Sequence, residues 1–145
     1  MSPRNLLLSL TLFVFATAGL RAQGQVTGEL QKWHRIQILF DGPQTSESAS
    51  QNPFLNYRLN VLFTAPDGRE FTVPGFFAAD GNAAESSATS GNKWAVRFSP
   101  DQVGTWTYTA SFRTGDEVAI SLDPNAGTAT GFDGASGSFQ IGLST

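Results

Sequence analysis

Residues 94–112 read WAVRFSPDQVGTWTYTASF, and this stretch decides the fold. Large side chains alternate with small or polar ones on both sides of a turn that contains proline and glycine. Successive side chains of a strand point to opposite faces, so this period of two predicts two strands that each have one apolar face. We expect a second layer of structure to cover that face. The expected core residues of this stretch are Trp94, Phe98, Trp106 and Tyr108.

The turn between these two strands carries Asp101, Gly104 and Trp106. In immunoglobulin-type domains an acidic residue, a small residue and an inward aromatic residue anchor the corner that leads into strand F. We therefore expect Trp106 to be a packing residue rather than a ligand-binding one.

The same alternation recurs along the chain between turns rich in Gly, Pro and Asp. It is found at residues 36–40, 57–63, 71–73 and 139–143, and a short strand is expected at residues 30–33. About seven strands with one apolar face each predict two sheets packed face to face, an all-β, immunoglobulin-like β-sandwich. A small barrel, which would enclose the same residues, is the alternative.

Three segments lack this alternation. Residues 41–43, Asp-Gly-Pro, are expected to form a turn. Residues 78–92 and 114–136 are rich in Gly, Ala, Ser, Thr and Asp, a composition typical of surface loops. Within the second loop, residues 118–122 could form a short edge strand.

The first 22 residues have the features of an export signal. Arg4 precedes an uncharged run at residues 6–18, and the small residues Ala18 and Ala22 end two candidate cleavage sites. At about 1.5 Å per residue this run is too short to cross a membrane core of about 30 Å. The pattern predicts a signal peptide at residues 1–22 and one secreted or periplasmic domain at residues 23–145, without stable membrane insertion. A short membrane anchor is the alternative.

Composition narrows the classes of function. Two of the nine basic residues, Arg4 and Arg21, lie in the predicted signal peptide, which leaves seven basic against twelve acidic residues. A domain with that balance is a poor partner for nucleic acid or for an anionic membrane. The chain has no cysteine, so neither a disulfide nor a thiolate zinc site is expected. Its stability has to come from an aromatic core.

No catalytic constellation is visible in the sequence. Most aspartates precede Gly or Pro, as in turns, and no facing pair of carboxylates of the kind glycoside hydrolases use is apparent. For His34, the single histidine, the sequence indicates no serine or threonine as a nucleophile that it could activate, so His34 is expected at the surface. We expect this chain to have no catalytic activity, no cofactor and no metal. A calcium site is left open by four acidic residues of the second loop, Asp116, Glu117, Asp123 and Asp133.

Two kinds of binding surface remain open. Aromatic residues outside the inward alternation could offer flat faces to sugar rings; these are Trp33, Phe76 and Phe132. Apolar residues on the polar side of their strands could form a docking face for another domain or protein if they cluster. These are Leu39, Leu62, Phe76 and Ala95. For both sets the competing interpretation is ordinary packing within the domain.

Five motifs occur in a characteristic order along the chain. They are Asn52-Pro53-Phe54, Val73-Pro74-Gly75-Phe76-Phe77, Asp80-Gly81, Trp94-Ala95-Val96-Arg97-Phe98-Ser99-Pro100 and Gly104-Thr105-Trp106-Thr107-Tyr108. Together they resemble the immunoglobulin-like domain of unknown function, family 5060, that precedes the TIM barrel of many secreted bacterial glycoside hydrolases. The resemblance covers residues 29–141.

The resemblance implies a function. It suggests a non-catalytic accessory module that packs against, or orients, a glycoside hydrolase barrel not present in this chain. The family has no established catalytic residue in this domain. The alternative is a free-standing secreted domain that binds a polysaccharide or another protein.

Overall fold

The structure, a computed structural model, describes residues 23–145, so the predicted signal peptide lies outside the described residues. Within this part the chain forms nine strands, one helical turn and one 3-10 turn. The strands are β1 (Gln25–Gly28), β2 (Ile36–Ser46), β3 (Tyr57–Thr64), β4 (Glu70–Pro74), β5 (Phe76–Phe77), β6 (Ser90–Phe98), β7 (Gly104–Thr114), β8 (Thr128–Ala129) and β9 (Ser136–Ile141). The helical turns are α1 (Ala83–Ser86) and η1 (Val118–Ile120). Among these residues no helix has the length and apolar character needed to cross a membrane.

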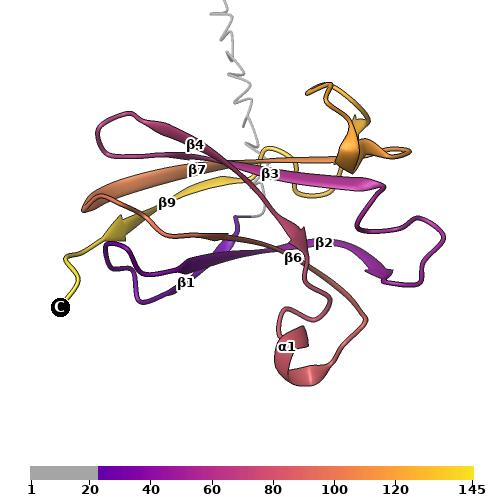
Figure 1. Cartoon of the computed structure of the whole chain (residues 1–145), viewed down its shortest axis with the longest axis horizontal. Helices are drawn as coiled ribbons and strands as arrows, with labels where there is room; N and C mark the ends of the chain where they lie inside the picture. The colour runs from indigo at the N-terminus through magenta and orange to yellow at the C-terminus, as the bar shows by residue number, and fades with distance from the viewer. Residues whose placement is uncertain (1–22) are drawn as a thin grey trace, which may run out of the picture.

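The strands form two antiparallel sheets that pack face to face (Figure 1). The first sheet has the order β1-β2-β6-β5, and the second has the order β4-β3-β7. Two further strands, β9 and β8, pair with opposite ends of β7 on its other side. The fold is therefore all-β and has two separate layers rather than a closed barrel.

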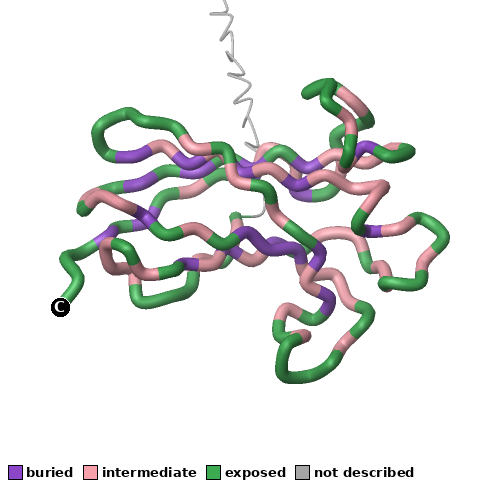
Figure 2. The backbone as a smooth tube through the Cα atoms, in the orientation of Figure 1, coloured by how far each residue is buried: buried purple, intermediate pink, exposed green. Residues whose placement is uncertain are grey.

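The alternation of side chains explains why these sheets face each other. On β7, Trp106, Tyr108 and Phe112 are buried, while the threonines between them are exposed. The other long strands repeat this pattern, so that buried positions line the space between the sheets (Figure 2). Trp94 is also buried there, and Phe98 is partly buried against the same core. The Tyr108 hydroxyl donates to the Gly24 carbonyl at 3.2 Å, which gives this buried polar group a partner.

Stacked rings tie the two layers together. The Phe132 ring lies between those of Phe40 and Phe112, with ring centroids 4.6 and 4.3 Å away and nearly parallel planes. Trp94 meets Phe112 edge to face at 4.7 Å. Offset and edge-to-face pairs of this kind are each worth about 0.5–1.5 kcal/mol beyond area burial. Phe132, one of the residues considered for sugar contact, is thus part of the core, only 5% exposed.

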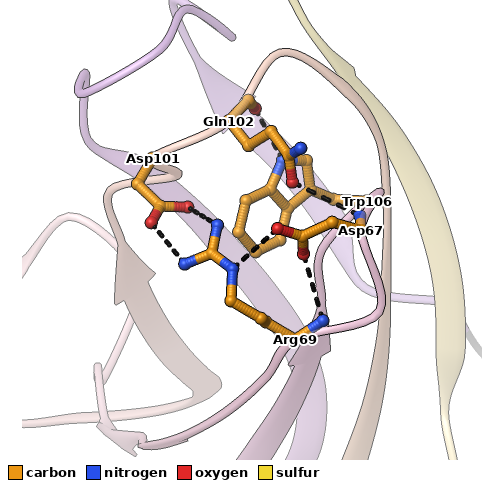
Figure 3. Close-up of polar contacts among 5 residues, drawn as sticks. All are labelled: Asp67, Arg69, Asp101, Gln102 and Trp106. Carbon is orange, nitrogen blue, oxygen red and sulfur yellow. Dashed lines mark hydrogen bonds and ion pairs between the residues drawn. The ribbon is translucent and has the colours of Figure 1, made fainter.

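The β6–β7 corner is fastened by the indole of Trp106 (Figure 3). Its Nε1 donates to the Gln102 carbonyl at 2.8 Å. Gly104 has a φ of +125° and lies against Pro66, where a Cβ would come within 2.9 Å. Asp101 does not bond the corner itself; it accepts from Arg69 of the β3–β4 hairpin at 2.8 Å.

The N-terminal strand predicted at residues 30–33 is wrong. The strand that pairs with β2 is β1, at Gln25–Gly28. Leu30 and Trp33 have φ values of +54° and +69°. Such left-handed conformations cannot continue a strand, and these residues instead form a turned loop between β1 and β2.

The turn predicted at residues 41–43 is also wrong, because β2 continues through it with a bulge between Asp41 and Thr45. At Gly42 a Cβ would lie 2.6 Å from the Trp94 ring. The indole Nε1 of Trp94 faces this glycine, is buried and has no hydrogen-bond partner among the described residues. A glycine and a bulge therefore let the strand pass a large buried ring.

The predicted loops contain more structure than expected. β6 begins at Ser90, inside the first of them, and α1 and the residues before it lie on the outside of the first sheet (Figure 1). In the second loop, residues 118–122 do not form a strand; Val118–Ile120 is the 3-10 turn η1. The alternation predicted to reach residue 143 stops at Ile141, and Leu143 is 75% exposed.

Candidate functional site

Seven large hydrophobic side chains are exposed in the described part of the chain, and six of them mark two regions. Phe54, Phe76 and Leu122 border a groove at one edge of the sandwich. Trp33, Val103 and Leu143 lie at the end of the sandwich where β9 finishes. We call the first region the edge groove and the second the end surface. The seventh, Ile120, lies on η1 and does not line the groove.

The edge groove exists because the chain crosses from one sheet to the other. β4 pairs with β3 as far as Pro74, which lies opposite Asn60. Gly75 then donates to the Leu59 carbonyl at 2.8 Å, and Phe76 pairs with Ala95 of β6. A Cβ on Gly75 would lie 2.4 Å from the Leu59 side chain and 2.6 Å from the Ala95 carbonyl oxygen, so only glycine fits this crossing.

The groove has a volume of about 800 Å³, within the range of small-molecule sites. Its aromatic lining residues are Phe54, Tyr57, Phe76, Phe77 and Trp94. The uncharged polar lining residues are Asn60, Thr72, Thr109, Ser111 and Ser121. The surface is therefore mixed, with flat apolar faces beside amide and hydroxyl groups.

A short turn positions Phe54 at the mouth of the groove. The Asn52 side chain accepts from the Phe54 amide at 2.8 Å, and the Asn56 side chain accepts from the Asn52 amide at 2.9 Å. Pro53 beside it is buried. The Phe54 ring meets Phe77 edge to face at 6.2 Å and stays 55% exposed, so a rigid turn presents it to solvent.

Arg58 holds the loop that forms one wall of the groove. Its guanidinium donates to the carbonyl oxygens of Val118, Ser121, Asp123 and Pro124 at 2.9–3.4 Å. Arg113, opposite Arg58 on β7, donates to the carbonyls of Asn125, Ala126 and Gly127 in the same way. Neither arginine has a carboxylate partner among the described residues. Their charge is balanced by the carbonyl dipoles of this loop, which they fix in place.

The four residues considered for a docking face are divided between the two sheets. Leu39, Ala95 and Phe76 lie in one row across β2, β6 and β5, on the outside of the first sheet. Leu62 lies on β3 in the second sheet, and it lines the edge groove together with Phe76. Ala95 is fully buried, and of the row only Phe76 is exposed, with the Arg97 guanidinium 5.1 Å from its ring.

The end surface is built by three loops that bond to one another. Trp33 donates its amide to the Pro100 carbonyl at 2.7 Å, and Lys32 donates to Gly142 at 2.9 Å. The Trp33 ring is 63% exposed, with the Lys32 ammonium group 5.4 Å from its centre. Its backbone has a φ of +69°, a conformation that costs about 1–2 kcal/mol for a residue with a Cβ. His34, in the same loop, is partly exposed, and its Nδ1 contacts the carboxylate of Glu29.

An ion network lies at the same end of the sandwich (Figure 3). Arg69 donates to Asp67 through its Nε and to Asp101 through both terminal nitrogens. The hydrogen bonds from Arg69 lower the pKa of Asp67 below its ordinary value, and the two carboxylates raise the pKa of Arg69. Because these groups are exposed, the network orders the hairpin tip more than it stabilises the fold.

Three other aspartates serve loop structure. The Asp133 carboxylate accepts from the Phe112 amide, and that of Asp123 accepts from the Asn125 amide, both at 2.8 Å. The side-chain hydroxyl of Ser86 and the Asn82 amide lower the pKa of Asp80, which is opposite to the rise that a general acid needs. Residues 23–145 hold no group of three or more His, Cys, Asp or Glu that could bind a metal ion.

The sequence analysis had singled out Phe76 and Leu62 as candidates for a binding surface, and both line the groove, but it missed Phe54 and Arg58. Phe54 lies in a motif that was noted only for its resemblance, and Arg58 looked like an ordinary outward residue of β3. The signal that could have found them is Asn-Pro-Phe followed by an arginine, a turn beside a charge that needs a partner. The partners of Arg58 are carbonyl groups of a loop about 60 residues further along the chain.

Comparison with known proteins agrees with the fold. No curated protein matches the chain at a significant level. A crystal structure of a protein named "putative glycoside hydrolase" from Bacteroides vulgatus is similar, with 21% identity and a TM-score of 0.50. The match covers 79% of this chain but only 16% of that one, so this chain spans about a sixth of its neighbour. At this level of identity the likeness concerns the fold alone.

A family match confirms the resemblance noted from the motifs. It covers residues 29–113, more than half of the 145 residues. The chain therefore belongs to the family described as "Domain of unknown function (DUF5060)".

Proposed function

We propose that the domain is a non-catalytic, immunoglobulin-like accessory module of a secreted carbohydrate-active enzyme, and that it docks on a glycoside hydrolase domain through the end surface. Export would follow from the signal peptide at residues 1–22. The single observation that carries the proposal is the exposure of Trp33, Val103 and Leu143 at one end of the sandwich. The family and the similar glycoside hydrolase structure support the class of partner.

The conformation of Trp33 strengthens this choice of surface. An exposed tryptophan in a left-handed conformation is held at a cost, and such strain persists where the surroundings impose it, often at functional positions. Here the hydrogen bond that the Trp33 amide donates to the Pro100 carbonyl imposes it. Tryptophan is also enriched among the residues that dominate protein interfaces. β9 ends beside this surface (Figure 1), so a domain that follows β9 in the same chain would meet it first.

The test begins with the coding sequence beyond Thr145, where the proposal expects an in-frame hydrolase domain. The protein containing both domains is then compared with Trp33→Ala and Leu143→Asp variants by calorimetry. We expect this domain to unfold at a higher temperature beside the hydrolase than alone, and each variant to remove that increment. Ile120→Ala, which changes an exposed apolar residue elsewhere, should leave it unchanged. A stop codon after Thr145, or variants that keep the full increment, would overturn the proposal.

A further inference from the structure

We infer that the edge groove binds an uncharged glycan, with sugar rings resting on the exposed faces of Phe54 and Phe76. This goes beyond the docking role of the end surface and does not depend on it, because the groove and the end surface share no residue. The inference rests on three properties of the groove: its aromatic faces, its polar groups and its charge.

The aromatic faces are available and held in place. Phe54 is 55% and Phe76 is 37% exposed, whereas most rings of the domain are stacked in the core. Phe54 sits on the hydrogen-bonded Asn52 turn, and Phe76 is fixed by pairing with Ala95 and by the Arg97 guanidinium. The C–H face of a pyranose is flat and apolar, so rings held in this way can bury it with a smaller entropic penalty for ordering side chains.

Four polar side chains that line the groove are not used for hydrogen bonds within the domain. Within residues 23–145, the side chains of Asn60, Thr72, Thr109 and Ser111 make no hydrogen bond to protein. They come from neighbouring strands in register, because Asn60 lies opposite Ser111, and Leu62 lies opposite both Thr109 and Thr72. Amide and hydroxyl groups can both donate and accept, which matches the rim of sugar hydroxyls around an apolar ring face.

The charge of the groove selects for a neutral ligand. Arg58 is the charged residue that lines it, and four loop carbonyls already occupy its terminal nitrogens. No acidic residue lines the groove, so a cationic ligand would find no partner. A polyanion would be repelled by a domain in which residues 23–145 carry seven basic and twelve acidic side chains. An uncharged, amphipathic polymer fits all of these conditions.

The experiment is affinity electrophoresis of the protein in native gels that contain galactomannan, xyloglucan, arabinoxylan or hydroxyethylcellulose. Polygalacturonate serves as the anionic comparison, and an acidic non-binding protein serves as the mobility reference. We expect at least one neutral polysaccharide to retard the protein in proportion to its concentration. Phe54→Ala and Phe76→Ala should each weaken binding about 5–30-fold, the range for truncating a contact residue worth about 1–2 kcal/mol. Asn60→Ala should weaken it too.

Ile120→Ala is the matched control, because it removes an exposed apolar side chain just outside the groove and should bind like the unchanged protein. Thermal unfolding of each variant separates lost binding from lost structure, and Phe54→Ala, on an exposed turn, is the variant expected to stay folded. Mobility equal to the reference in every neutral gel overturns the inference. So does retardation that Phe54→Ala and Asn60→Ala both leave unchanged, or retardation by polygalacturonate alone. A negative result would leave the docking experiment on the end surface unaffected.

Discussion

Replacing Trp106 by alanine should destabilise the domain more than almost any other single change. The side chain is fully buried and packs against Phe98 and Phe71, with ring centroids 5.2 and 6.0 Å away. Deleting a buried tryptophan side chain to alanine costs about 3–5 kcal/mol. The change also removes the 2.8 Å hydrogen bond to the Gln102 carbonyl, which adds about 1 kcal/mol. A loss of this size is a large part of the about 5–15 kcal/mol that holds an ordinary domain folded.

Trp106→Phe separates packing from hydrogen bonding. Phenylalanine keeps much of the apolar contact but cannot donate to Gln102, so we expect a smaller loss of about 1–3 kcal/mol. Urea unfolding followed by far-UV circular dichroism measures both changes without relying on tryptophan fluorescence. In the isolated domain Trp33→Ala is the matched control: the same substitution at a ring that is 63% exposed should change the free energy of unfolding by no more than about 0.5 kcal/mol.

The reasoning fails if Trp106→Ala costs less than about 1 kcal/mol with an unchanged dependence on urea, because a fully buried ring could not then be supporting both sheets. The part of the reasoning that concerns the β6–β7 corner fails if Trp106→Phe is as stable as the unchanged protein. In that case the hydrogen bond to Gln102 would contribute nothing to the β6–β7 corner.

Three further outcomes follow from the geometry. Gly75→Ala should lower the free energy of unfolding, measured in urea, by about 1–3 kcal/mol, because the added Cβ would overlap Leu59 and Ala95. Ser111→Ala, at an exposed position, should leave it unchanged. Arg58→Met should speed amide hydrogen exchange in residues 116–124 and leave the exchange of β3 unchanged, because Arg58 holds the carbonyls of this loop. Arg97→Met is the control and should leave the loop protected. Equal protection of the loop in the unchanged protein and in both variants would show that the carbonyl contacts do not order it. The pKa of Asp67, followed by NMR, should lie below its ordinary value of 3.8, and Arg69→Gln should raise it; a pKa that Arg69→Gln leaves unchanged would refute this. Because the folded-state pKa is the lower one, the small contribution of Asp67 to stability is present above about pH 4. It is lost as the pH falls through the folded-state pKa.

How far the sequence predicted this structure depends on the range of the interactions involved. The burial of Trp106, Tyr108 and Phe112 follows from a local period of two, because a strand that covers one face must bury every second residue. The bulge in β2 could not be predicted locally. Asp-Gly-Pro is a good turn in isolation, and it is extended here because Trp94 of another strand occupies the space beside Gly42.

The same distinction explains the errors in the loops. Residues 118–122 carry apolar alternation, but Arg58 draws the carbonyls of Val118 and Ser121 toward one guanidinium. A strand directs successive carbonyls to opposite sides, so this contact requires a turn. Phe132, likewise, sits among loop residues in the sequence and is buried only because Phe40 and Phe112 lie on either side of it.

The motif Val73-Pro74-Gly75-Phe76-Phe77 shows how a local pattern can specify a site without revealing it. Pro74 is the last residue of β4 and lies opposite Asn60, and the Gly75 amide then makes one more hydrogen bond to β3, to the Leu59 carbonyl at 2.8 Å. Only a glycine at position 75 fits between Leu59 and Ala95. The next two residues point to opposite faces of the first sheet, Phe76 outward and Phe77 into the core. The residues that move the chain between the sheets thus also place an exposed ring at the edge groove.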